Sequence, residues 1–374
     1  MRMKILSVLL LLVLVSMTVF TQELHYSYYQ FTPLNVNPAN AGAFSGSYRI
    51  SGIFSDKQAA ITPRPFRTFT LSADAPIIRG IRKQDWIGIG IEADIIGKSG
   101  LNFNEQSNSI NPEVNSSFTQ SWTFMKIGAA YHFSLDKKQT NIITFGAQFI
   151  NGSRDYNRLN QKDGRVKLQT GFNDFDIEHF NLGPAQGAGS GNNNSNNVEF
   201  NAYKDLNVGF LFNARRKTSD LRLGFALEGL LNPAVGFESR STTRDSVETK
   251  YFGLNIHASY DMEINKKTHI VPALYYYSLG PANALNVNSH VWYQIDPEKE
   301  FKVGAGLGLR NFRAAIIYLG AEFKDIRVGL AYDIDLSSAT IGSKSVGGFE
   351  LCASYMGKIY KKPKPKAVIF CPSL

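Results

Sequence analysis

The sequence predicts an all-β fold, a transmembrane outer-membrane β-barrel of about 14 antiparallel strands, and three observations support this fold class. Segments in which apolar residues alternate with small or charged residues recur along most of the chain. The polar row of these segments is too small and too charged to fill the interior of a soluble barrel. The connections between the segments alternate between long and short, as they do in barrels that cross the outer membrane.

The stretch 86–97, WIGIGIEADIIG, shows the alternation most clearly. Isoleucines and one alanine form one row, whereas glycines together with Glu92 and Asp94 form the other. Period-two alternation indicates an extended strand with one apolar face. About ten such residues match a strand tilted across a bilayer. A soluble sandwich could also contain one such strand, so the prediction depends on the repetition of the pattern.

The chain begins with two segments that we place outside the barrel. Arg2 and Lys4 precede an apolar run at 5–15, and small or polar residues follow as far as Thr21, which is typical of a secretory signal peptide at 1–21. Residues 22–46 are polar and aromatic, and their prolines and glycines argue against helix or central strand. We expect 22–46 to be a periplasmic segment.

The barrel is expected to occupy residues 47–360, followed by a Lys-rich periplasmic tail at 361–374. An even number of strands brings both ends of the barrel, and on this interpretation both termini, to the periplasmic side. The predicted strands lie at about 47–54, 67–74, 85–97, 118–134, 140–151, 203–214, 221–231, 249–261, 268–279, 283–294, 301–309, 314–323, 326–335 and 348–360.

The connections provide an independent indication of the fold. Long ones are expected at about 55–66, 98–117, 152–202, 232–248 and 336–347, and short charged turns between them, such as 215–220, 296–300 and 324–325. Long loops on one side and short turns on the other are typical of outer-membrane barrels. Two connections on the long side, near 280–282 and 310–313, are short exceptions.

Charged residues of the predicted inner row carry both signs in similar number. A selective ion pore would more typically present a ring of one sign. The mixture indicates a lumen crossed by ion pairs or filled by a peptide segment. The residues are Glu92, Asp94, Arg222, Glu228, Lys302, Arg310, Arg327, Asp333, Asp335 and Glu350.

Nothing in the sequence has the pattern of an enzyme, so we predict no enzymatic activity, no cofactor and no metal site. None of the six histidines has a cysteine or carboxylate partner at metal-ligand spacing. A Ser–His–acid triad is recognised by geometry, so a catalytic barrel remains a distant alternative. Asp174, Asp176 and Glu178 alternate in the longest loop, where a solvated loop face is favoured over a calcium site.

The two cysteines leave two interpretations open. A disulfide between Cys352 and Cys371 would require the tail to fold back into the barrel, whereas otherwise Cys352 is a small lumen residue. The formal net charge is +9, and part of the excess lies in lysines near the carboxyl terminus. In an exported chain without a nucleic-acid-binding motif, contact with a protein partner or anionic headgroups is favoured over nucleic acid.

Several motifs resemble the PorP/SprF family of Bacteroidetes. They are PLNVNPANAG at 33–42, the Asp94-x-x-Gly97 end of the third strand, IRVGLAYDIDLSS at 326–338, GGFELCASY at 347–355, and the Lys-rich stretch that ends in Cys371-Pro372. Together they cover essentially the whole mature chain. Cys352 departs from the small polar residue expected at that position, and the tail ends in Ser373-Leu374.

The resemblance implies a non-enzymatic outer-membrane component of type IX secretion and, in some members, of gliding motility. It implies that the barrel helps to export or anchor secreted proteins that carry a C-terminal secretion domain, including adhesins. It also implies contact with periplasmic type IX components similar to PorE and to the PorK/PorN ring. The family motif supplies no catalytic or ligand residues.

We expect the partner contacts at two places and keep one rival function. The long loop, with Asp174, Asp176 and Glu178, is assigned to cargo. The tail is assigned to periplasmic partners through Lys361, Lys362, Lys364, Lys366 and Cys371. The rival is a porin or transporter for small solutes, which the lumen glycines favour and the mixed lumen charges disfavour.

Overall fold

Alternating side chains define the two faces of each strand. In β3 (Trp86–Ser99), Ile91 has 53% of its surface exposed, whereas its neighbour Glu92 has 1% exposed. In β5 (Ser116–Ser134), Met125 and Ile127 are exposed and Lys126 between them is buried. The apolar row therefore faces outward and the polar row inward, which is the arrangement of strands that contact lipid.

These observations come from a computed structural model of the chain. The structure describes residues 26–57, 66–82, 84–99, 102–103, 116–159, 197–199, 203–231, 252–279, 282–336 and 346–359. The predicted signal peptide, most of the long connections and the Lys-rich tail lie outside these residues. No helix among the described residues is long and apolar enough to cross a membrane.

Fourteen antiparallel strands form the wall of a closed barrel, which confirms the predicted fold class and strand number. Besides β3 and β5, the wall strands are β1 (Tyr48–Lys57), β2 (Phe66–Arg79), β6 (Asn141–Leu159), β8 (Tyr203–Arg215), β9 (Ser219–Glu228), β10 (Gly253–Asn265), β11 (Thr268–Leu279), β12 (Ala282–Asp296), β13 (Phe301–Arg310), β14 (Ala314–Phe323), β15 (Ile326–Asp335) and β16 (Val346–Gly357).

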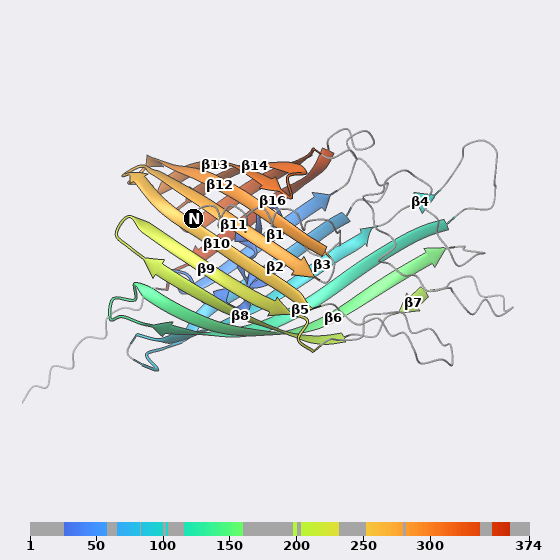
Figure 1. Cartoon of the computed structure of the whole chain (residues 1–374), viewed down its shortest axis with the longest axis horizontal. Helices are drawn as coiled ribbons and strands as arrows, with labels where there is room; N and C mark the ends of the chain where they lie inside the picture. Colours follow the sequence, from blue (N-terminus) through green and yellow to red (C-terminus); the bar gives the residue numbers. More distant parts are fainter. Residues whose placement is uncertain are drawn as a thin grey trace, which may run out of the picture.

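Pairing of the first and last strands closes the barrel. β1 pairs with β16 from Tyr48 opposite Gly357 to Lys57 opposite Gly348. Closure leaves no wall strand with an unpaired edge, which lipid could not satisfy with hydrogen bonds. Figure 1 shows the strands running obliquely around the barrel.

The predicted boundaries differ from the structure most at β6, which ends at Leu159 and not near 151, and less at β2 and β10. At β5 the prediction differs only at the start of the strand. The strands β5 and β6 extend beyond their neighbours, as Figure 1 shows, because they pair with each other as far as Ser117 opposite Leu159. The expected loop at 152–202 therefore contributes its first eight residues to β6. Two short strands, β4 (Asn102–Phe103) and β7 (Asn197–Glu199), pair with the extended parts of β5 and β6.

The connections separate onto two ends of the barrel, as the sequence predicts. Short turns at 80–85, 135–140, 216–218, 266–267, 297–300 and 324–325 share what we call the short-turn end. The other connections share the opposite, long-loop end. The two expected exceptions, 280–281 and 311–313, are short connections at that end.

A charge on the outward face should destabilise the barrel in a depth-dependent way. We expect Ile127→Lys, at a side chain 63% exposed in β5, to lower the free energy of unfolding in lipid vesicles by about 2–4 kcal/mol. Leu135→Lys, in the adjoining short turn, is the matched control and should cost about 1 kcal/mol or less. Guanidinium unfolding of both variants measures the difference, and equal losses would contradict a lipid-facing β5.

Candidate functional site

The residues before β1 fill part of the barrel lumen, and we call residues 26–46 the plug. The plug contains three short helical turns, η1 (Tyr29–Phe31), α2 (Pro33–Val36) and η2 (Pro38–Asn40). Pro33 and Pro38 begin the second and third turns, because proline fits the first helical position. Ser27, Asn37 and Ala39 are completely buried. The sequence interpretation of 22–46 as a segment outside the barrel is therefore wrong for its described part.

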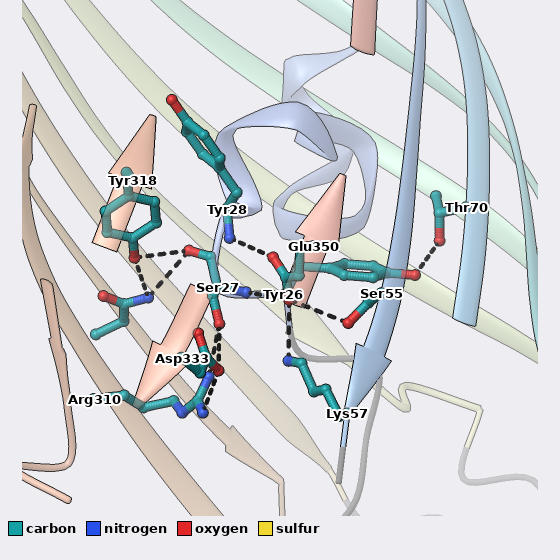
Figure 2. A network of polar contacts seen from close by, with 11 residues as sticks. Tyr26, Ser27, Tyr28, Ser55, Lys57, Thr70, Arg310, Tyr318, Asp333 and Glu350 are labelled. Atoms are coloured by element: carbon teal, nitrogen blue, oxygen red, sulfur yellow. Dashed lines mark hydrogen bonds and ion pairs between the residues drawn. The ribbon is translucent and has the colours of Figure 1, made fainter. Parts of the chain in front are cut away.

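The plug begins against a polar cluster, the Glu350 network, formed by Ser27, Tyr28, Lys57, Arg310, Asp333 and Glu350. The two carboxylate oxygens of Glu350 accept hydrogen bonds from the backbone N–H groups of Ser27 and Tyr28, each at 2.8 Å. Lys57 Nζ lies 3.1 Å from the same carboxylate. Figure 2 shows Glu350 between the plug backbone and Lys57.

A second ion pair of the network holds the side chain of Ser27. Its hydroxyl donates to Asp333 at 2.9 Å and accepts from Arg310 Nη1 at 2.8 Å. Arg310 Nη2 also donates to Asp333 at 2.7 Å. Hydrogen bonds to charged groups contribute about 1.5–3 kcal/mol each, so the start of the plug is held firmly to the wall.

The aromatic side chains of the plug pack against the inner face of the barrel wall. Glycines of the strands leave space there, because they have no side chain. Tyr28 stacks on His290 with the ring centroids 5.3 Å apart, and it meets Tyr318 edge-on. A Cβ at Gly329 would lie 2.6 Å from Tyr28, closer than van der Waals contact allows. The alternating glycines of the strands therefore leave room for the plug.

The middle of the plug is fixed by hydrogen bonds to the backbone of the wall. The Asn37 amide donates to the carbonyls of Phe210 and Phe225 at 2.9 and 3.2 Å. Its oxygen accepts from Ala39 N–H within the plug at 2.8 Å. A Cβ at Gly209 would lie 2.0 Å from that oxygen, so this position of the wall requires glycine.

The last part of the plug reaches the short-turn end. His132 Nε2 donates to the Ala41 carbonyl at 2.8 Å, and Asp74 accepts from Gly42 N–H at 2.7 Å. Gly42 has φ +72°, a conformation that favours glycine. Ser47 N–H then bonds to the Gly357 carbonyl, where β1 begins beside β16.

The described start of the chain lies nearer the opposite end of the barrel from the one expected from the sequence. Ser27 contacts the halves of β15 and β16 nearest the long-loop end, whereas β1 begins at the short-turn end. The described chain ends at Ile359 beside Ser47, also at the short-turn end. The expectation that both termini leave on one side holds for the barrel strands. It does not hold for the described start of the chain.

Several lumen charges are paired, as one sequence interpretation predicts. Lys126 Nζ lies 2.9 Å from Glu92 and 2.7 Å from Asp94, and it donates to Asn35 of the plug at 2.9 Å. Glu322 pairs with both Lys302 and Arg327 on the opposite wall. These pairs support the interpretation of a lumen crossed by ion pairs and filled by a peptide segment.

The partner-binding residues predicted from the sequence lie outside the described residues. They are Asp174, Asp176, Glu178, Lys361, Lys362, Lys364, Lys366 and Cys371. Cys352 is a free thiol, buried with Tyr26, Tyr28 and Phe31. Among the described residues, no group of three histidine, cysteine, aspartate or glutamate side chains is placed to hold a metal ion.

A family model described as "Type IX secretion system membrane protein PorP/SprF" matches residues 18–355 of this sequence. The chain belongs to this family. It is a type IX secretion system outer-membrane β-barrel. The family is one of secretion-system membrane barrels and not of enzymes, in agreement with the prediction from the sequence. No curated protein matches the sequence.

Solved structures share the fold. The toluene transporter TbuX of Ralstonia pickettii has a TM-score of 0.51 at 12% identity, covering 88% of this chain and 94% of that chain. The Pseudomonas putida toluene transporter TodX has a TM-score of 0.50 at 9% identity, covering 90% and 99%. At this identity the likeness concerns the barrel alone.

The Glu350 network makes a prediction about the dynamics of the plug. Glu350→Gln replaces one carboxylate oxygen by an NH₂ group, which cannot accept a hydrogen bond from the backbone N–H of Ser27 or Tyr28. We therefore expect amide hydrogen exchange in residues 26–31 to accelerate. A lost charge-assisted hydrogen bond of about 1.5–3 kcal/mol corresponds to roughly a tenfold to hundredfold change in local opening.

Hydrogen-exchange mass spectrometry measures this change in protein held in lipid nanodiscs. Glu298→Gln, in an exposed short turn, is the control and should exchange like the parent protein. Unchanged protection of 26–31 in Glu350→Gln would show that the network does not hold the plug.

Proposed function

We propose that this barrel is a non-enzymatic component that helps to export secreted proteins bearing a C-terminal secretion domain, or anchors them at the cell surface. The observation that carries the proposal is the plug. A segment tied to opposite walls by the Glu350 network, Asn37 and Asp74 leaves no free passage for a protein chain along its path. Cargo would then contact the barrel from outside the lumen.

The long-loop end offers the surface for such contact. The strands that flank the long connections end there, including β6 and β8, which flank the connection that contains Asp174, Asp176 and Glu178. In an outer-membrane barrel, the longer loops are the extracellular ones. We therefore assign cargo to this end. The short-turn end and the following Lys-rich tail are assigned to periplasmic type IX components, which resemble PorE or PorK/PorN in this proposal.

The rival function, a porin or transporter for small solutes, is less well supported by the lumen. A porin needs a continuous aqueous channel, whereas the plug occupies the lumen with buried tyrosines, alanines and asparagines. From the sequence alone, the inner glycines favour a channel. Some of these glycines, such as Gly209 and Gly329, instead contact the plug. The toluene transporters provide a barrel architecture, not evidence of this activity.

Capture of the barrel with its partners tests the proposal. An affinity tag inserted in 183–197 allows the barrel to be isolated in mild detergent from cells with an active type IX system. Mass spectrometry should find a stoichiometric secreted protein with a C-terminal secretion domain. A barrel that elutes without such cargo would contradict the anchoring role.

A plug-locked variant separates contact at the rim from passage through the lumen. Ala41 in the plug and Ala130 in β5 belong to one buried cluster. The test uses the variant with Ala41→Cys and Ala130→Cys, after mass spectrometry has verified that oxidation joins the two cysteines. Cargo display should be the same in locked cells and in cells with Ala130→Cys alone. Loss of display only when the disulfide forms would mean that the plug must move for cargo to pass.

A further inference from the structure

The short-turn end contains a cavity that neither the barrel fold nor the family description explains. It has a volume of about 690 Å³ and is lined by plug residues 43–47, by the starts and ends of strands, and by the short turn at 138–140. Cavities of roughly 300–1,000 Å³ are the usual size of ligand sites in proteins. Several lining residues, including Arg79, Lys138 and Arg215, are exposed, so the cavity is open at this end of the barrel.

The lining has an excess of positive charge. Its basic side chains are Arg79, Lys138, Arg215, Arg222 and Lys358, and its acidic ones are Asp85 and Asp220. These side chains come from β2, from the turn after β5, from β8 and β9, and from the end of β16. The charges are therefore distributed around the cavity and do not converge on one point.

The two carboxylates already have partners. Asp85 accepts from Tyr131 at 2.8 Å and from Ser134 N–H at 3.0 Å, and it lies 3.4 Å from Arg82. Asp220 lies 3.5 Å from Arg215 and also interacts electrostatically with Arg222. Neither carboxylate is therefore available to neutralise the other basic side chains of the lining.

Three basic side chains remain without a carboxylate at ion-pair distance among the described residues. Arg79 donates only to the Gly46 carbonyl, at 3.0 Å, and Lys138 and Arg222 form no ion pair with a described residue. The adjoining Asp136 does not line the cavity. Its carboxylate accepts hydrogen bonds from the backbone N–H groups of Asn141, Thr140 and Lys138, which lower its pKa and keep it ionised. Asp136 instead closes the turn that presents Lys138.

Among the described residues, Asp85 and Asp220 are the only carboxylates that line the cavity. Lys358 and Ile359 line the cavity, and the sequence that follows them, 360–374, contains lysines and no acidic residue. This segment would add to the positive charge, so it is an unsuitable occupant. An occupant of opposite charge must come from another molecule.

We propose that this cavity binds an acidic peptide segment of a second protein on the short-turn side of the membrane. Distributed cations match carboxylates spaced along a peptide better than they match a single phosphate. Asn213, which also lines the cavity, has a buried Oδ1 that accepts no hydrogen bond from the part of the chain that the structure describes. A peptide N–H can donate to this oxygen after a small rotation of the amide, whereas an anion that only accepts cannot. Asn213 and Arg222 lie on the same faces of β8 and β9 as Gly209 and Gly224, which approach Asn37 of the plug, so this part of the lining faces the lumen, where a lipid could not keep its acyl chains in the bilayer.

The probe for this proposal is a fluorescein-labelled peptide of six aspartates, compared with one of six asparagines. Fluorescence anisotropy measures binding to the full-length barrel in nanodiscs of zwitterionic lipid. We expect saturable binding of the aspartate peptide alone, weakened by added salt because exposed charges are screened. Saturable binding of both peptides, or of neither, would overturn the proposal.

Matched variants locate the binding site. Arg79→Gln with Lys138→Gln removes two exposed lining charges and should weaken binding about tenfold, the scale of two solvent-exposed ion pairs. Lys217→Gln with Lys266→Gln removes two exposed charges from short turns at the same end that do not line the cavity, and it should leave binding unchanged. Equal weakening by the two pairs would show a diffuse surface attraction and overturn the proposal.

Two further measurements, one with an additional variant and one with a competing anion, test whether the peptide occupies this cavity. Arg222→Gln, deeper in the cavity, should also weaken the aspartate peptide, provided that heat-dependent migration on a gel shows a folded barrel. Displacement of the peptide by inorganic phosphate at equal molar concentration would identify a phosphate site and contradict the peptide assignment. Failure of this experiment leaves the cargo proposal unaffected, because cargo is assigned to the opposite end.

Discussion

Filling of the lumen is the constraint on which the rest of the structure depends. An inner row made of glycines and charges cannot pack against itself across a barrel of this size. The plug supplies the missing volume with Tyr28, Phe31 and Leu34, and the strands supply glycines where its backbone or rings approach most closely. The wall and the plug are therefore complementary parts of one interior. The position of Gly209 against the Asn37 amide illustrates this fit.

Electrostatics explains why the plug stays in place. Asp74, Glu92, Asp333 and Glu350 are almost completely buried, and a buried carboxylate is costly unless it is paired and hydrogen-bonded. Wall cations satisfy part of this requirement, and Ser27, Tyr28 and Gly42 of the plug satisfy more of it through N–H or hydroxyl groups. Removal of the plug would leave several carboxylates short of partners. The ion pairs and the plug thus support one another.

The two ends of the barrel have different chemistry as a result. At the short-turn end the plug passes into β1 and leaves a basic cavity above its last residues. At the other end the first described residues of the plug contact β15 and β16. A closed interior with two distinct rims suits a protein that holds partners on its faces, and we regard cargo contact and acidic-peptide binding as separate uses of these rims.

The sequence predicted the wall well because alternation is a local signal. Residues 86–97 reveal both faces of β3, and the same reading located all fourteen wall strands and both short exceptions among the long-side connections. The mixed lumen charges indicated ion pairs or a peptide segment, and the structure contains both. The plug itself was missed as the occupant, because its helical turns are only three or four residues long and its contacts join Ser27 to residues some three hundred positions away. PLNVNPANAG marked the segment, but only the folded wall shows where it lies.

Ion conductance in a planar bilayer tests the filled lumen most directly. The account predicts that the full-length barrel gives no steady open-channel current. A variant lacking 26–46 that still inserts should give such a current. A large, steady conductance of the intact protein would contradict the account, because it would require a continuous aqueous path past the plug.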